Sequence, residues 1–90
     1  MAEITEELVV VNTLGMHARP AASLVERVLP FTCDVYVQMD GSRVNAKSIM
    51  GLLTLAAARG SRITVTCKGP DAEAAMEAVR ALFASGFGED

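Results

Sequence analysis

The stretch that decides the fold runs from residue 33 to residue 46 and reads CDVYVQMDGSRVNA. In its first half, apolar side chains occupy every second position, at Cys33, Val35, Val37 and Met39. Alternation with a period of two predicts a β-strand with one covered face. Asp40-Gly41 is a favoured two-residue hairpin turn, so residues 42–46 are expected to return as an antiparallel partner strand.

A strand and a helix are predicted before this hairpin. Residues 4–11 are β-prone and end at the turn former Asn12, which predicts a strand. Residues 18–29 place apolar side chains on one helical face and charged ones outside it, and Pro30 ends this helix. The apolar face consists of Ala21, Leu24, Val25 and Val28.

A second helix and a fourth strand are predicted after the hairpin. Residues 48–58 predict a helix with Ser48 as its N-cap and Gly60 as its stop. The internal Gly51 weakens this helix, so a short or irregular one is expected. Residues 63–67 alternate between apolar and polar side chains and predict the strand.

The last helix is expected to be capped by Asp71 and closed by Gly86. Its apolar stripe consists of Ala72, Ala75, Met76, Val79, Leu82 and Phe83. The element order is therefore βαββαβα. One-sided strands and amphipathic helices predict an α+β fold of two layers, an antiparallel sheet with helices on one face and an open second face. Residues 1–90 are expected to form a single domain.

The composition excludes several classes of function. The chain has 90 residues, 51% of them hydrophobic, and no tryptophan, so one small core of aliphatic side chains and Met is expected. A net charge of −3 argues against a nucleic-acid binder that relies on phosphate attraction. The lack of a long apolar run argues against a signal segment or membrane span, and a cytoplasmic protein is expected. Cys33 and Cys67 are interpreted as reduced core thiols without a redox or metal role.

The single histidine, His17, lies in the segment 13-TLGMHARPA-21, directly before a predicted helix. A neutral imidazole is a competent nucleophile at cellular pH, and the phosphoramidate that it forms can pass the phosphoryl group onward. The free amides of Ala18 and Arg19 could bind the phosphoryl oxygens, and the guanidinium of Arg19 suits phosphate. Gly15 permits a tight turn before the histidine. The segment predicts transient capture of a phosphoryl group; the simpler interpretation is a polar residue that hydrogen-bonds the backbone.

Two motifs at the expected separation resemble the HPr family, the small phosphocarrier proteins of the bacterial phosphoenolpyruvate-dependent phosphotransferase system. The family signature stands here as 15-GMHARPA-21, and the segment around the family's regulatory serine as 45-NAKSIMGLLTL-55. The turn at Gly60 and the sequence Gly69-Pro70-Asp71 before the last helix also fit. The resemblance therefore covers nearly the whole chain.

The resemblance implies an open-faced β-sandwich, a four-stranded antiparallel sheet with three helices on one face. It implies that enzyme I phosphorylates His17 on Nδ1, drawing on phosphoenolpyruvate, and that the group passes to a histidine of a IIA protein or domain of a sugar permease. Arg19 matches the family's phosphate-stabilising residue. The chain would be a phosphoryl-transfer intermediate more than a turnover enzyme. Neither cofactor, metal, nucleic acid nor membrane is implied, and a monomer is expected.

The second motif implies regulation. In many members the serine that matches Ser48 is phosphorylated by an ATP-dependent HPr kinase/phosphorylase, and KSIMG is typical of its substrates; the simpler interpretation is an ordinary N-cap. A phosphate at a helix N-cap gains from free amides and the helix dipole. Ile49 and Met50 are assigned to a surface on which partners dock, and the charge of the phosphate would weaken the docking of enzyme I there. For Leu53, docking and core packing both stay open.

Two other roles within the family stay open. A regulatory relative would bind a transcriptional regulator or an enzyme in its Ser48-phosphorylated form, but known relatives of that kind lack the active histidine. A nitrogen-branch carrier would use the same chemistry with other partners, and residues 12–17 resemble its lead-in. The departures from the family pattern are Thr13-Leu14, where many members have Ser or Asn before the glycine, and Ala56, where glycine is common.

Two unrelated classes share part of the element order. An RNA-recognition sheet would need stacking aromatics and a basic surface, which Tyr36 in an acidic chain does not supply. An acylphosphatase-like enzyme would need an arginine cradle in the first loop and an asparagine on a strand. Asn45 could supply the asparagine, but the loop residues do not form the cradle.

Overall fold

The computed structural model describes residues 2–89 of the chain. One antiparallel sheet is the framework of the fold. Within these residues the strands are β1 (Glu3–Val9), β2 (Asp34–Met39), β3 (Ser42–Asn45) and β4 (Arg62–Lys68). Their order in the sheet is β1-β4-β2-β3, and all neighbours are antiparallel. The helices are α1 (Ala18–Val28), α2 (Ile49–Thr54) and α3 (Ala72–Ala84), followed by the short 3₁₀ helix η1 (Gly86–Gly88).

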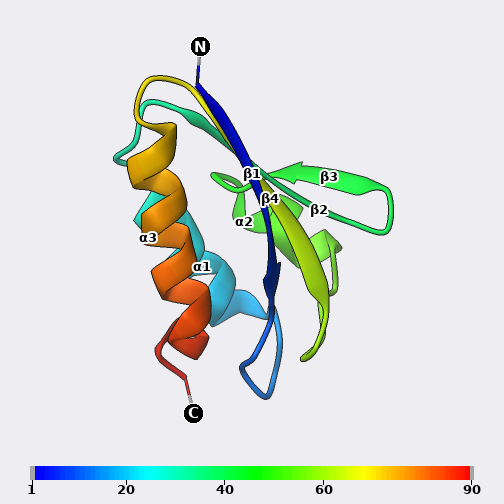
Figure 1. Cartoon of the computed structure of the whole chain (residues 1–90). Coiled ribbons are helices and arrows are strands. Elements are labelled where there is room, and N and C mark those ends of the chain that lie inside the picture. The colour runs from blue at the N-terminus through cyan, green and yellow to red at the C-terminus, as the bar shows by residue number, and fades with distance from the viewer. Residues whose placement is uncertain (1, 90) are drawn as a thin grey trace.

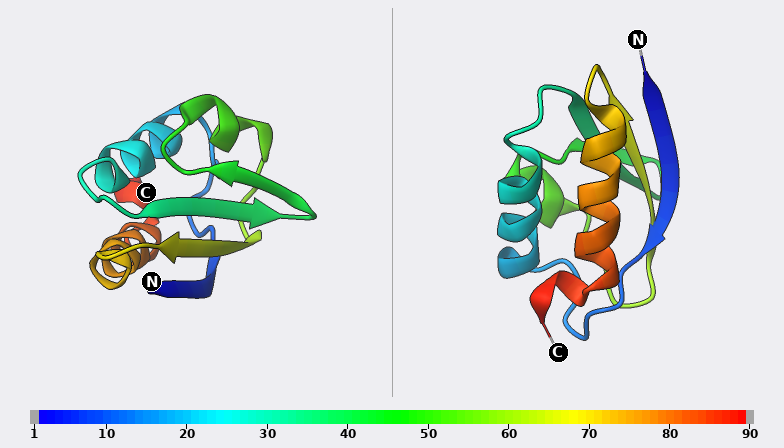
Figure 2. Two further views of the ribbon diagram at one scale, coloured as in Figure 1. Left: turned by 90° about the horizontal axis from the view of Figure 1, so that it is seen from above. Right: turned by 60° about the vertical axis from the view of Figure 1, so that its left-hand side comes forward.

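The helices cover one face of the sheet and leave the other open (Figures 1 and 2). Figure 2 shows α1 and α3 side by side on that face, and the two helices are in contact. This arrangement is an open-faced β-sandwich of class α+β. The predicted fold and the βαββαβα order are confirmed.

The hairpin forms where its turn residues allow it. Asp40 and Gly41 both have positive φ, at 49° and 82°, as a type I′ turn requires. Met39 therefore pairs with Ser42, and Tyr36 pairs with Asn45 further along the ladder. In β2 and β4 every second side chain is buried, which leaves the intervening residues on the open face.

The core lies between the sheet and the helices. The predicted helix stripes are buried on α1 and α3, so each helix turns its apolar face to the sheet or to its neighbour. Cys33 and Cys67 are both buried and unbridged. Burial, together with the hydrogen bond to Asp71, raises the pKa of Cys33 to about 11, and burial also raises the pKa of Cys67. Both thiols are protonated and poor nucleophiles at neutral pH.

The second helix is short, as the internal Gly51 predicts, but it ends earlier than the predicted residues 48–58. It ends at Thr54, and Gly60 as its stop is wrong. The chain leaves the helix at Ala56, whose φ of 51° is incompatible with a continuing helix, and the segment that follows turns toward the loop before α1. Gly60, with φ 89°, instead lies in the turn that leads into β4.

Asp71 stands at the N-cap position of α3, as predicted, but its side chain makes no capping hydrogen bond. Its carboxylate accepts the backbone N–H groups of Thr32 and Cys33, each at 2.8 Å. These hydrogen bonds, that of Thr32 first, hold the pKa of Asp71 below its ordinary value. The carboxylate therefore joins the start of α3 to the loop between α1 and β2.

Candidate functional site

His17 stands at the N-cap of α1. Its backbone is extended (φ −94°, ψ −169°), and its side chain makes no capping hydrogen bond. Its ring is 36% exposed. The amides of Ala18 and Arg19 follow in the first turn, where a helix offers no carbonyl partner. A nucleophilic side chain thus lies at the edge of a helix end whose amides are available to an anion.

The loop before His17 is held by the segment after α2. The Met16 amide donates to the Ala57 carbonyl at 2.8 Å. Gly15 has a φ of 69°, and a Cβ at this position would lie 2.4 Å from the same Ala57 oxygen. The tight turn that Gly15 was predicted to permit is confirmed, and the structure adds that neither the backbone conformation nor the space admits a side chain.

The imidazole is held from the far end of the chain. Nε2 of His17 lies 3.0 Å from both carboxylate oxygens of Glu89, whose side chain is only 10% exposed. Asn12, fully buried, donates from Nδ2 to Glu89 Oε1 at 2.9 Å and to the Gly15 carbonyl at 2.7 Å. The hydrogen bond from His17 lowers the pKa of Glu89; burial opposes this shift, and Asn12 and the charge of Arg19 reinforce it. Glu89 is therefore an ionised acceptor at neutral pH.

Sequence reasoning missed both Asn12 and Glu89 as site residues. Glu89 is 72 residues from His17 in the chain. The signal that could have found it is Phe87, a large apolar residue between two glycines beyond the predicted helix stop, which indicates that the chain returns to the core. The polar Asn12 next to the histidine loop gave no sign of its burial.

Arg19 lies in the first turn of α1 and is exposed. Its positive charge contributes to lowering the pKa of Glu89, and in sequence it follows His17 by two residues. The structure therefore brings together His17, Arg19 and the two predicted amides at one helix end.

Ser48 is confirmed as the N-cap of α2, since its Oγ accepts the Gly51 amide at 3.1 Å. The predicted docking residues follow it and are exposed, Ile49 by 40%, Met50 by 74% and Leu53 by 36%. Leu52 is the residue of α2 that enters the core. We call Ile49, Met50 and Leu53 the α2 apolar surface. Leu14, in the loop before His17, is also 73% exposed and was not predicted as a site residue.

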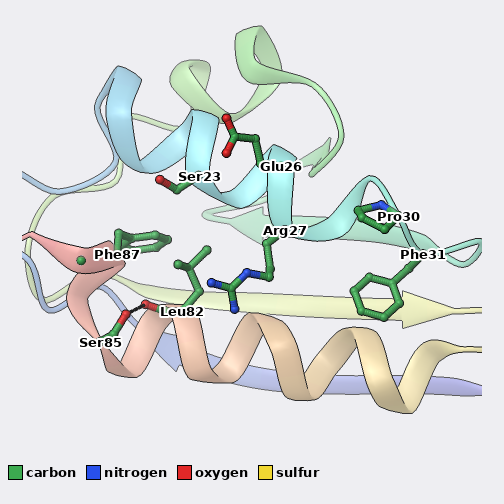
Figure 3. A pocket seen from close by; sticks show the side chains of 9 residues that line it. Ser23, Glu26, Arg27, Pro30, Phe31, Leu82, Ser85 and Phe87 are labelled. Atoms are coloured by element: carbon green, nitrogen blue, oxygen red, sulfur yellow. Dashed lines mark hydrogen bonds between the residues drawn. The ribbon is translucent and has the colours of Figure 1, made fainter.

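A separate groove of about 630 Å³ lies between α1 and α3 (Figure 3). Its lining consists of Ser23, Glu26, Arg27, Pro30, Phe31, Leu82, Ser85, Phe87 and Gly88. Figure 3 shows Phe87 and Phe31 at opposite ends of it, and Ser85 donates to the Leu82 carbonyl at 2.8 Å. The groove contains neither histidine nor cysteine. Over residues 2–89 no three His, Cys, Asp or Glu side chains gather into a metal site.

The chain is similar to known proteins in sequence and in fold. The family model of the PTS HPr component phosphorylation site matches residues 4–85. The chain is similar to the phosphocarrier protein HPr of Xylella fastidiosa (strain 9a5c), with 44% identity over 87 residues, 97% of this chain and 98% of that one. It is similar to the phosphocarrier protein NPr of Escherichia coli (strain K12), with 43% identity over 88 residues, 97% and 98% of the two chains.

The fold agrees with a solved structure of the same kind. The crystal structure of HPr-C-His from Thermoanaerobacter tengcongensis superposes with a TM-score of 0.90 at 39% identity, over 100% of this chain and 99% of that one. No helix in the described part of the chain is both long and apolar enough to cross a membrane. The family match spans far more than half of the chain, and the fold agrees with it. The chain belongs to the HPr family of phosphocarrier proteins.

Proposed function

We propose that the chain is a cytoplasmic, monomeric carrier of the sugar phosphotransferase system. It accepts a phosphoryl group from phospho-enzyme I on His17 and passes it to a histidine of a IIA protein or domain. The observation that carries this proposal is the half-exposed imidazole of His17 at the uncapped N-terminus of α1, inside the segment that the family model matches.

The residues at this helix end divide the chemistry. The Nδ1 lone pair of His17 forms the new N–P bond, while the bond from phosphorus to the donor histidine breaks and its electron pair stays on the donor ring. The amides of Ala18 and Arg19 bind phosphoryl oxygens, and the helix dipole favours their charge. The guanidinium of Arg19 offsets the negative charge that arrives.

The α2 apolar surface is the proposed docking site for enzyme I and IIA proteins. Its side chains are exposed although they are apolar, and α2 packs against α1, which carries His17. Met50, the most exposed of the three, is flexible enough to fit partners of different shape. Partners that bury this surface would be brought beside the imidazole.

Ser48 is the proposed target of an HPr kinase/phosphorylase, with a transcriptional regulator as a partner of the phosphorylated form. Its Oγ is at the start of α2, directly before Ile49 and Met50. A phosphate there adds charge and hydration to the docking surface, so docking of enzyme I would weaken. Lys47 is not free to pair with that phosphate, because its Nζ donates to the carbonyls of Phe31 and Cys33 at 2.8 and 3.0 Å.

A nitrogen-branch carrier is the second candidate. The Escherichia coli NPr resembles the chain almost as closely as the Xylella fastidiosa HPr does, at 43% against 44% identity. The chemistry at His17 would be the same, and only the enzyme I and IIA partners would differ.

The test is phosphorylation by purified partners. The chain is incubated with enzyme I, phosphoenolpyruvate and Mg²⁺, and its intact mass is measured before and after mild acid. One acid-labile phosphate on the wild type and none on His17→Ala is the expected result. No phosphate on the wild type would contradict the carrier function.

Onward transfer separates the two branches. The phosphorylated chain is offered a sugar-permease IIA protein and a nitrogen-branch IIA protein in parallel. Faster transfer to the sugar IIA is expected, and faster transfer to the nitrogen IIA would favour the second candidate. Incubation with HPr kinase and ATP should add an acid-stable phosphate that is absent from Ser48→Ala.

A further inference from the structure

Among the described residues 2–89, one nitrogen of the His17 imidazole, Nε2, has a hydrogen-bond partner. Nε2 lies 3.0 Å from each oxygen of the Glu89 carboxylate. Within residues 2–89, no hydrogen bond engages Nδ1. Because an ionised carboxylate has only acceptors, Nε2 must carry the proton in this contact, and the lone pair of a neutral ring is then on Nδ1.

The carboxylate is itself held in place. Asn12, fully buried beneath the loop, donates one N–H to Glu89 Oε1 and the other to the Gly15 carbonyl. The same Gly15 carbonyl accepts the amide of His17 at 3.0 Å. Asn12 thus fixes the carboxylate relative to the backbone that carries the imidazole. The Glu89 carboxylate is therefore an acceptor with a fixed position relative to the ring, unlike the carboxylate of a mobile surface side chain.

The C-terminal segment returns Glu89 to the site through an unusual backbone. Gly86, Phe87 and Gly88 all have positive φ, at 65°, 59° and 74°. Phe87 adopts this conformation although it is not glycine, and it is kept there by burial and by its ring contact with Phe83, 4.8 Å between centroids. A strained residue persists where its surroundings hold it. Two residues beyond Phe87, the side chain of Glu89 reaches His17.

We propose that Glu89 is a positioning residue for phosphoryl transfer. Its carboxylate holds the tautomer of His17 in which Nδ1 is the nucleophile, and it stabilises the positive charge that the ring acquires when Nδ1 forms the N–P bond. The proton on Nε2 stays on the ring throughout, and the electron pair of the broken donor bond stays with the donor. Triads that pair a carboxylate with a histidine use the same relation. This inference rests on the proposed function.

The test compares Glu89→Gln with Glu77→Gln. Glu77 lies on the exposed side of α3, so its substitution removes the same charge away from the site. Two quantities are measured on the full chain: the His17 tautomer, from the ¹⁵N shifts of the ring nitrogens, and the rate of phosphorylation by enzyme I. An amide can donate to Nε2 as well as accept from it, so the Gln variant no longer enforces one tautomer.

Glu89→Gln should gain the Nδ1–H tautomer and lose about tenfold in rate, the lower end of the effect known for the hydrogen-bond partners that orient metal-ligating histidines. Glu77→Gln should match the wild type in both, and Glu89→Asp should recover part of both. An unchanged tautomer or an unchanged rate in Glu89→Gln would overturn the proposal. A wild type that enzyme I does not phosphorylate would instead contradict the proposed function, and the tautomer measurement would still report whether Glu89 holds the ring.

Discussion

The N-termini of α1 and α2 differ in whether a side chain caps the backbone amides of the first turn. At α2 the Ser48 side chain accepts the Gly51 amide, so the helix end is satisfied by its own cap. At α1 the N-cap residue His17 gives no such bond, and its ring is held from outside by Glu89. A side-chain N-cap typically adds about 1 kcal/mol to the free energy of unfolding, and α1 lacks this contribution. The comparison indicates that the open helix end is the one suited to a transient anion.

The start of α3 shows that a missing cap bond is not sufficient. Asp71 also makes no cap bond to its own helix, but its carboxylate is occupied by the amides of Thr32 and Cys33. A negative side chain at that place repels an anion. What distinguishes α1 is the combination of free amides with a histidine and an arginine.

The largest expected effect comes from removing the charge at the open helix end. Arg19→Ala should slow phosphorylation of His17 by about 100-fold, in line with the loss of one group that stabilises a charged transition state. Arg27→Ala is the matched control, because Arg27 is exposed in the last turn of the same helix. Rates are measured with limiting enzyme I. Equal slowing in both variants would indicate that general charge, and not position, is responsible.

The next effect tests the loop that supports the open helix end. Gly15→Ala should lower the free energy of unfolding by at least about 2 kcal/mol, from a strained φ and a clash with the Ala57 carbonyl. Gly41→Ala is the control, since Gly41 also has positive φ but has no atom near its missing Cβ. Urea denaturation measures both variants. A loss in Gly15→Ala no larger than in Gly41→Ala would refute the close approach.

The capped helix end gives a smaller effect of a different kind. Ser48→Ala should lower the free energy of unfolding by about 1 kcal/mol, because the Gly51 amide loses its acceptor. Ser48→Asn, which keeps a capping oxygen, should recover most of it. His17 should still be phosphorylated in both. A stability unchanged in Ser48→Ala would show that the cap contributes nothing.

The smallest expected effect is a pH dependence at the start of α3. The folded pKa of Asp71 lies below its ordinary value, chiefly through the hydrogen bond from Thr32. Its contribution to stability is therefore present above the ordinary carboxyl pKa and is lost as the pH falls through the lower folded value. Between about pH 5 and about pH 2, the wild type should lose more stability than Asp71→Asn does.

Urea denaturation at both pH values measures this difference. Asp34→Asn is the control, because Asp34 is an exposed acidic residue of β2. A pH dependence that is the same in Asp71→Asn and the wild type would contradict the role of the Asp71 carboxylate.

Local sequence signals predicted most of the fold. The alternation in residues 33–39, the Asp40-Gly41 turn and the stripes of α1 and α3 depend on neighbours within a few positions, and all are confirmed. The segment around His17 likewise predicted a helix directly after the histidine, and α1 begins at Ala18. The features that were predicted wrongly or missed depend on contacts between residues that are far apart in the sequence.

Three features of the structure could not be predicted from the sequence. The carboxylate of Asp71 turns to a loop 38 and 39 residues earlier instead of to its own helix. The second helix ends early at Thr54 because the segment after it supports the loop before His17. Glu89 meets His17 only after the C-terminal segment folds back over Phe83.

The most direct test of phosphoryl transfer through His17 is the position of the phosphate on its ring. The chain, labelled with ¹⁵N in its histidine, is phosphorylated by enzyme I and observed by ¹⁵N and ³¹P NMR. Phosphorus is expected on Nδ1 of His17, with the proton kept on Nε2. Phosphorus on Nε2, the nitrogen that Glu89 holds, or a histidine that gains no phosphate, would contradict it.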